Sequence, residues 1–127
     1  MMVTFRPDAG LIVIRATLTG PGGDTIVRLA LDTGATRTLI VPSILSLIGC
    51  DPSASSEFRK AATVSGVEYA PLVQVNMVEA IGHRRENLSV LCQSLPANVG
   101  VDGLLGLDFL RGMELNIDFR MGKLSLT

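Results

Sequence analysis

The apolar residues of this chain occur in short runs that glycine, proline and charged residues interrupt. Residues 11–20 and 25–31 are two such runs, and the turn composition GPGGD lies between them, which predicts a hairpin over residues 11–31. Residues 61–93 predict two or three further strands, with turns near Ser65-Gly66 and around Gly82-His83. Residues 113–127 predict a closing hairpin around Met121-Gly122. This pattern indicates a mainly β fold.

Two segments favour short helices. PSILSLIG, residues 42–49, has a proline where a helix can begin and a glycine where one can end. LLGLDFLRG, residues 104–112, predicts a second short helix that stops at Gly112. Pro71 interrupts a strand run and indicates an edge strand or a hairpin. We expect a single domain over residues 1–127 with one or two short helices.

Composition excludes several classes of function. The net charge is -1 and the densest basic cluster is Arg84-Arg85, too small for a nucleic-acid footprint. No apolar run approaches the roughly 18 residues of a membrane span. The opening residues lack the apolar core of a secretory signal, so we expect a cytoplasmic protein. We therefore predict neither nucleic acid nor membrane as a partner.

The residues that bind metals or act as nucleophiles are sparse. His83 is the only histidine and lies in the polar stretch GHRREN, where a solvated turn residue is expected and a metal site is not. Cys50 and Cys92 stand apart without metal or redox spacing. Two buried thiols are expected, and a disulfide between them is the alternative.

One carboxylate follows an apolar run directly, in LALDTGATRTLI, residues 29–40. A carboxylate that acts as a general base on water needs a fixed orientation, and Gly34 allows a turn tight enough to aim backbone N–H groups at Asp32. The hydroxyls of Thr33 and Thr36 are candidates for locking the loop. Asp-Thr-Gly is also a routine turn at the end of a strand, so the tripeptide alone leaves both interpretations open.

A second motif, VDGLLGLDFL at residues 101–110, lies about 70 positions later. Together the two motifs resemble the retropepsin-type aspartic proteases and are similar to bacterial members, over roughly residues 10–120. The resemblance implies that Leu104, Leu105 and Gly106 belong to a strand that packs beneath the aspartate loop and that residues 107–110 form a short helix after it. Leu107 precedes Asp108 where retroviral members usually have Arg before Asn or Asp, which puts their salt bridges in doubt.

The family resemblance also implies an active site built from two chains. Only one Asp-Thr/Ser-Gly occurs here, whereas the family mechanism needs two carboxylates that share one proton. Two copies of Asp32 would meet across the twofold axis of a symmetric homodimer. Thr33 would hydrogen-bond across the axis, and Gly34, Ala35 and Thr36 would support the loop. No cofactor or metal is implied.

The resemblance further implies a closed, barrel-like lobe whose central hairpin covers the site as a flap. That hairpin is placed at residues 58–72 and binds an extended peptide or protein substrate as an added strand. The flap candidates are Val64, Ser65, Gly66, Val67 and Tyr69. The predicted activity is that of an aspartic endopeptidase. The alternatives are a non-catalytic dimer of the same fold that binds peptides or serves assembly, and an ordinary β-barrel or sandwich whose Asp-Thr-Gly is a turn.

Overall fold

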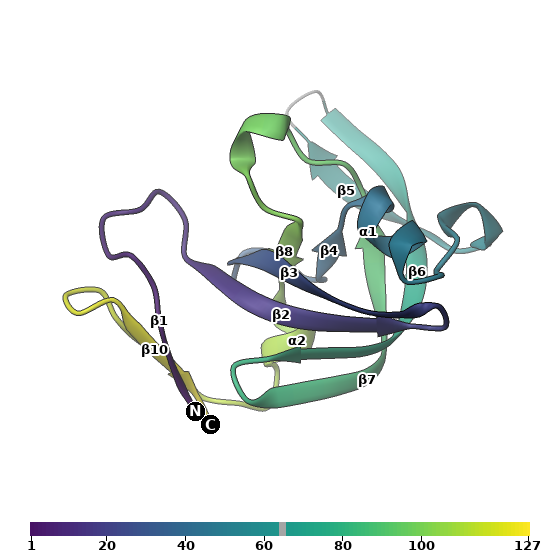
Figure 1. The fold of residues 1–127 in the computed structure, drawn as a ribbon. Helices are drawn as coiled ribbons and strands as arrows, with labels where there is room; N and C mark the ends of the chain where they lie inside the picture. Colours follow the sequence, from purple (N-terminus) through teal and green to yellow (C-terminus); the bar gives the residue numbers. More distant parts are fainter. Residues whose placement is uncertain (64–65) are drawn as a thin grey trace.

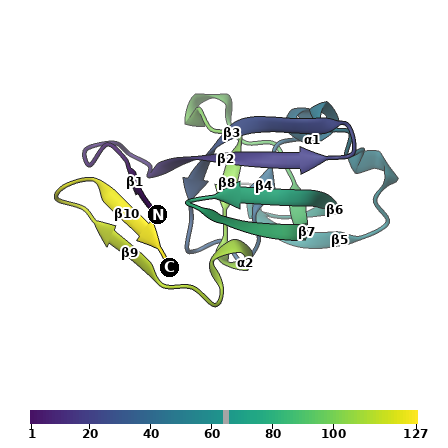
Figure 2. The same ribbon diagram turned by 60° about the horizontal axis from the view of Figure 1, so that its bottom comes forward.

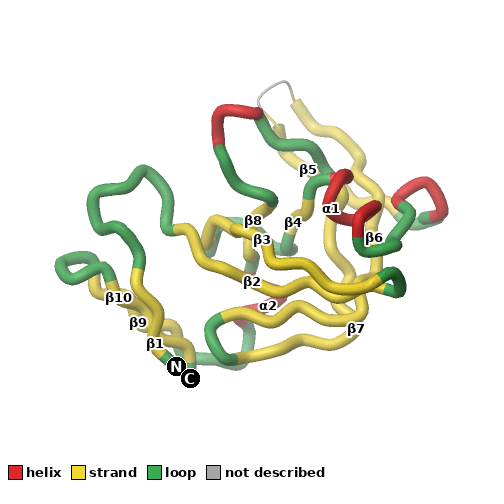
Figure 3. The backbone as a smooth tube through the Cα atoms, viewed as in Figure 1, coloured by secondary structure: helices red, strands yellow, loops and turns green. Residues whose placement is uncertain are grey.

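The structure is a computed structural model that describes residues 1–63 and 66–127 of the chain (Figure 1). Strands dominate and the helices are short (Figure 3). The strands are β1 Met2–Thr4, β2 Val13–Gly20, β3 Gly23–Leu31, β4 Leu39–Ile40, β5 Phe58–Thr63, β6 Gly66–Ala80, β7 His83–Cys92, β8 Gly103–Leu105, β9 Leu115–Asp118 and β10 Lys123–Leu126. The helices are α1 Pro42–Leu47 and α2 Leu107–Leu110, with single 3-10 turns at Pro52–Ala54 and Ala97–Val99. The predicted mainly β architecture is confirmed.

Six strands close into a barrel in the order β2-β3-β8-β4-β7-β6, because β6 also pairs with β2. The strands alternate between core and solvent, as β2 shows by burying Ile14, Ala16 and Leu18 and pointing Arg15 outward. Among the buried side chains of the described residues, Thr38 is the only polar one and the others are apolar. The largest fully buried side chains are Phe109, Leu18, Leu29, Ile40, Leu45, Ile48, Leu105, Leu124 and Leu126. Closure removes the free edges that an open sheet of this size would expose.

The fifth strand extends from the barrel as half of a hairpin. β5 pairs only with the first part of β6, from Phe58↔Pro71 to Thr63↔Gly66, and β7 takes over as the neighbour of β6 from Leu72 onward. Pro71 therefore lies where β6 changes partners. The N–H of Leu72 faces the β5 side of the strand and donates to the Glu57 carbonyl. The backbone nitrogen of Pro71, which has no hydrogen to donate, therefore faces the opposite side, where the pairing of β6 with β7 begins only at Leu72.

The two chain ends lie side by side in a separate small sheet of order β1-β10-β9, shown in Figure 2. The predicted C-terminal hairpin is confirmed, with Gly122 at φ 68° in its turn. β1 was not predicted, because its partner β10 is almost the whole chain away in sequence. The imidazole Nε2 of His83 lies 2.7 Å from the Leu126 carbonyl oxygen and connects this sheet to the barrel. The prediction of a solvated His83 was wrong, since its ring is half-buried against β10.

The helix predictions hold for one segment and fail in part for the other. α1 begins at Pro42 as predicted and ends at Leu47. In the second segment, residues 103–105 form strand β8 and the helix is limited to Leu107–Leu110, which is the division that the family resemblance implied and composition did not. Residues 103–105 form a strand and not a helix because β3 and β4 supply backbone hydrogen bonds on both of its sides. Among the described residues, no helix is long and apolar enough to cross a membrane.

Both cysteines are buried and free, as the first of the two alternatives predicted. The Cys50 Sγ lies 3.7 Å from the carbonyl oxygen of Gln74, to which it donates a weak hydrogen bond. Burial raises the pKa of the Cys50 and Cys92 thiols, because the surrounding apolar groups disfavour the thiolate. These side chains therefore act as small apolar core residues.

We predict that Gly103→Ala strongly destabilises the protein. A Cβ at position 103 would lie 2.0 Å from the backbone oxygen of Leu39, which the neighbouring strand holds in place. Overpacking of this kind costs about 3 kcal/mol of unfolding free energy. Urea denaturation measures the loss, with Gly10→Ala as the matched control because a Cβ there meets nothing within 4 Å. Equal stabilities of the two variants would contradict the placement of β8.

Candidate active site

Asp32 lies at the first position after β3, in a loop whose backbone holds its side chain. Its N–H donates to the Leu105 carbonyl at 3.0 Å, and its carbonyl accepts from Ala35 N–H at 3.2 Å. The Gly34 N–H donates to Asp32 Oδ1 at 2.9 Å. The carboxylate is half-buried and oriented by a backbone donor two residues ahead. This is the orientation that the Asp-Thr-Gly turn was predicted to supply.

The second sequence motif lies directly beside the Asp32 loop. β8 pairs in parallel with β3, through Ala30↔Leu104 and Leu31↔Leu105, and antiparallel with β4 on its other side. Leu105 is fully buried. The structure thus brings together the two segments that the sequence separated by about 70 residues.

Gly106 is required by the close contact between the motifs. A Cβ at this position would lie 2.7 Å from the Arg37 carbonyl carbon and 2.8 Å from the Ala35 oxygen. The next residue, Leu107, donates its N–H to the Ala35 carbonyl at 2.8 Å. A side chain at position 106 would therefore push the aspartate loop away from β8.

A buried polar network that sequence reasoning missed locks the same contact. Thr38 is fully buried, and its Oγ1 donates to Asp108 Oδ1 at 2.7 Å while it accepts from Gly106 N–H at 3.1 Å. The Thr38 N–H donates to both Asp108 carboxylate oxygens at 2.9 Å each. The available signals were weak: a threonine next to a charged residue in ATRT, and an aspartate in the first turn of a short helix.

The two threonines predicted to lock the loop take no part in this network. Thr33 and Thr36 are exposed, and neither hydroxyl makes a hydrogen bond to any residue in the described part of the chain. Thr36 contributes through its carbonyl, which accepts from Asp108 N–H at 3.2 Å. Thr38 is therefore the hydroxyl that holds the loop within one chain. A bond from Thr33 to a second chain stays a prediction.

A cavity of about 640 Å³ opens beside Asp32. Its lining comes from the aspartate loop, from β4, β7 and β8, and from β5 of the hairpin: Asp32, Gly34, Ala35, Thr36, Arg37, Leu39, Arg59, Lys60, Leu91, Gln93 and Leu104. Asp32 is the only acidic residue among these described lining residues. The hairpin predicted over residues 58–72 therefore borders the Asp32 cavity through β5.

The proposed flap candidates occupy the other strand of that hairpin. Gly66, Val67 and Tyr69 lie on β6, and the last two are exposed by 65% and 66%. Their side chains do not line the cavity described here. Val64 and Ser65 lie outside the described residues.

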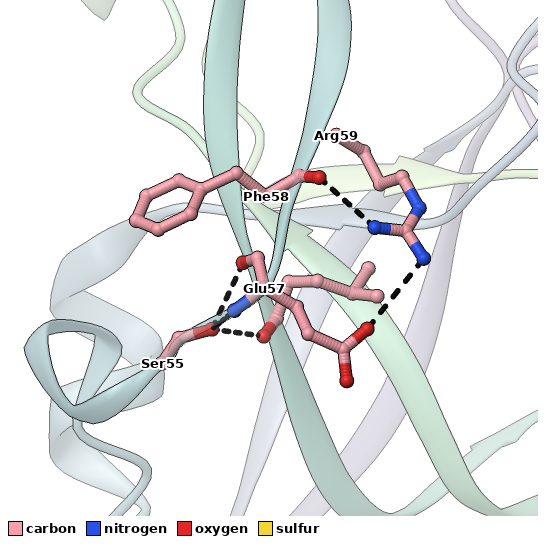
Figure 4. A network of polar contacts seen from close by, with 5 residues as sticks. Ser55, Glu57, Phe58 and Arg59 are labelled. Atoms are coloured by element: carbon pink, nitrogen blue, oxygen red, sulfur yellow. Dashed lines mark hydrogen bonds and ion pairs between the residues drawn. The ribbon is translucent and has the colours of Figure 1, made fainter.

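The base of the hairpin is held by Ser55, as Figure 4 shows. Its Oγ donates to the Leu72 carbonyl at 2.6 Å, and the Leu72 N–H donates to the Glu57 carbonyl at 2.9 Å. Arg59 folds back on the same segment, with Glu57 Oε2 at 3.5 Å and the Phe58 carbonyl at 2.9 Å. The base is thus fixed relative to β6, next to the cavity.

The chemistry that this arrangement allows centres on one oriented carboxylate. Within residues 1–63 and 66–127, no group of three or more His, Cys, Asp or Glu side chains is placed to hold a metal ion. The cavity offers the carboxylate of Asp32, apolar surface and cationic side chains. A lone carboxylate can take one proton from water but has no acid beside it to protonate the group under attack.

Comparison with known proteins identifies a matching family and a similar solved fold. The sequence model described as aspartyl protease matches residues 14–109. The fold is similar to a retropepsin-like aspartic protease from Rickettsia conorii, with a TM-score of 0.73 and 22% sequence identity over 99% of this chain and 88% of that chain. No curated protein matches the chain. The predicted retropepsin-like fold is confirmed.

We predict that Thr38→Val destabilises the protein by about 2 kcal/mol, because it keeps the side-chain shape but leaves the Gly106 N–H and an Asp108 oxygen without the hydroxyl. The matched control is Thr36→Val, whose exposed hydroxyl has no hydrogen bond to a described residue and should matter by less than about 0.5 kcal/mol. Chemical denaturation of both variants makes the comparison. Similar losses in the two would contradict the locking role of Thr38.

Proposed function

Because the chain belongs to the aspartyl protease family, we propose that it is an endopeptidase that hydrolyses peptide bonds in extended polypeptide segments. The proposal treats residues 1–127 as one catalytic domain and requires no cofactor. The observation that carries it is the oriented Asp32 carboxylate, fixed by the Gly34 N–H, at the border of a cavity large enough for substrate side chains.

Because each chain has only one Asp-Thr/Ser-Gly motif and the family mechanism needs two carboxylates, the proposed enzyme is a homodimer. The sequence has one Asp-Thr/Ser-Gly, and Asp32 is the only acid among the described residues that line the cavity. A symmetric dimer supplies the second copy of Asp32 without a second motif. The exposure of Thr33 and Gly34 in the single chain supports this arrangement, since the loop surface is available to a partner copy. Thr33 would then bond across the axis.

In the proposed dyad the two Asp32 carboxyls share one proton, because two like charges a few ångströms apart are costly. The ionised carboxyl takes a proton from water, whose oxygen attacks the scissile carbonyl carbon. The protonated carboxyl gives its proton to the carbonyl oxygen. Collapse of the resulting diol breaks the C–N bond as the amine nitrogen receives a proton from the dyad and a diol hydroxyl returns a proton to it, which leaves the carboxylic acid and the amine.

Substrate would bind as an added strand between the Asp32 loop and the hairpin. β5 pairs on one side with β6, and no strand among the described residues pairs with its other edge, which borders the cavity through Arg59 and Lys60. The hairpin over residues 58–72 would close on the peptide, with Gly66, Val67 and Tyr69 of β6 at its outer part. The proposed flap also includes Val64 and Ser65.

We predict that Asp32→Asn abolishes peptidase activity, by at least about a thousandfold in kcat/KM, because an amide neither takes a proton from water nor shares one. The side-chain shape is nearly kept, so folding and dimerisation should survive. Cleavage of a denatured protein substrate measures the activity, and sedimentation at micromolar concentration measures the dimer. A pepstatin-like inhibitor should stop the wild type.

Two results would oppose this proposal in different ways. Activity retained by Asp32→Asn would place catalysis elsewhere in the chain. A dimer that binds peptides but never cleaves them, in the wild type as in the variant, would support the non-catalytic alternative.

We predict a bell-shaped dependence of kcat/KM on pH, with its maximum on the acid side of neutrality. One carboxyl of the pair must be ionised and the other protonated, so the rate rises as the base forms and falls as the shared proton is lost. His83 contacts Leu126 and does not line the Asp32 cavity, so His83→Gln should leave both limbs in place. Initial rates in overlapping buffers test this, and a rate that climbs steadily to alkaline pH contradicts a dyad.

A further inference from the structure

The cavity beside Asp32 has a cationic border. Arg37, in the loop that follows Asp32, and Arg59 and Lys60, on β5, all line it, and Asp32 is the single described acid that does. The charge of Arg59 is partly offset by Glu57, with Nη2 and Oε2 separated by 3.5 Å. Arg37 and Lys60 form no ion pair with any residue in the described part of the chain. Two cations without an ion-pair partner among the described residues therefore border the cavity.

The rest of the cavity lining is suited to a hydrocarbon stem. Leu39 is 8% exposed, and Leu91 and Leu104 are half-buried next to it. These side chains come from three adjacent strands, β4, β7 and β8, so their surface is continuous. A ligand group with methylenes at its base and a negative charge at its tip would match both parts of the lining.

We propose that this cavity is a subsite for an acidic side chain of the substrate, with Arg37 and Lys60 as the residues that determine the preference. Glutamate fits the chemistry better than aspartate, because its second methylene reaches further over the leucine surface before the carboxylate meets the cations. This inference rests on the proposed function, since it describes which extended peptides that same site accepts.

The carboxylate belongs to a side chain and not to a peptide C-terminus. An endopeptidase site binds chain on both sides of the scissile bond, and the cavity lies beside Asp32, where chain continues in both directions. In the proposed homodimer each protomer contributes one such cavity, so the preference occurs on both sides of the scissile bond. Because successive side chains of an extended strand point to opposite faces, glutamate should help at alternate positions only.

The test uses paired peptides that differ by a single Glu or Gln, both with amidated C-termini so that the side chain is the only carboxylate at the tested end. The Glu or Gln is moved one position at a time along the peptide. At about pH 5.5, where a peptide glutamate is ionised, we expect kcat/KM for the best Glu peptide to exceed that of its Gln partner by about tenfold. At about pH 3.5 the ratio should fall toward one while the Gln peptide is still cleaved.

Variants assign the preference to individual cations. Arg37→Gln and Lys60→Gln should each lower the Glu/Gln ratio by about threefold, because each removes one cation that meets the glutamate carboxylate. The control is Arg120→Gln, in the exposed turn before β10 and away from the cavity. Raising ionic strength from about 0.05 M to about 0.5 M should lower the ratio in the wild type as well.

The outcomes separate the two proposals. A Glu/Gln ratio near one, with both peptides cleaved, overturns the acidic subsite and leaves the endopeptidase in place. A preference that survives both variants assigns it to other residues and also overturns the inference. If neither peptide is cleaved, the proposed function fails, and the ratio of the Kd values for the two peptides on Asp32→Asn protein, measured by calorimetry, still decides whether the subsite exists.

Discussion

The insertion of β8 between β3 and β4 is the constraint on which the rest of the structure depends. A three-residue strand is hydrogen-bonded on both sides, in parallel to the strand that ends at Asp32 and antiparallel to β4. This leaves no space for a side chain at Gly103 or Gly106, where a Cβ would meet backbone atoms of the neighbouring segments. Two glycines thus fix how closely the Asp32 loop approaches the core, and the apolar residues between them bury the contact.

Much of this fold follows from the sequence because its strands are separated by strong turn signals. The GPGGD hairpin and the Met121-Gly122 hairpin are local, so composition alone predicts them. β8 and β1 are different. Local composition does not distinguish the short β8 segment from a helix, so only the family resemblance implied its strand, and the partner of β1 lies at the opposite end of the chain. Those elements exist because tertiary neighbours supply their hydrogen bonds.

The candidate site also combines local features, which the sequence predicts, with contacts between distant residues, which it does not. Asp32 and the Gly34 donor are neighbours in sequence, so their geometry is predictable from the tripeptide. The bond between Thr38 and Asp108 spans 70 residues, and nothing in either local stretch identifies the other as its partner. A buried hydroxyl with two hydrogen bonds is costly to leave incomplete, so the network specifies one position of the loop relative to α2. The loop is therefore rigid before any partner or substrate binds.

That rigidity bears on how a half-site can work. In the proposed homodimer each chain brings its Asp32 already oriented, so association has only to place two finished loops against each other. Every residue then occurs in both halves of the site, so a substitution at Thr38 would disturb both carboxylates and a substitution at Arg37 would change both cavities. Activity also becomes tied to protein concentration, because the dyad exists only in the assembled state. In the proposed homodimer, one encoded loop thus supplies both carboxylates, and the two halves of the site cannot be altered separately by mutation.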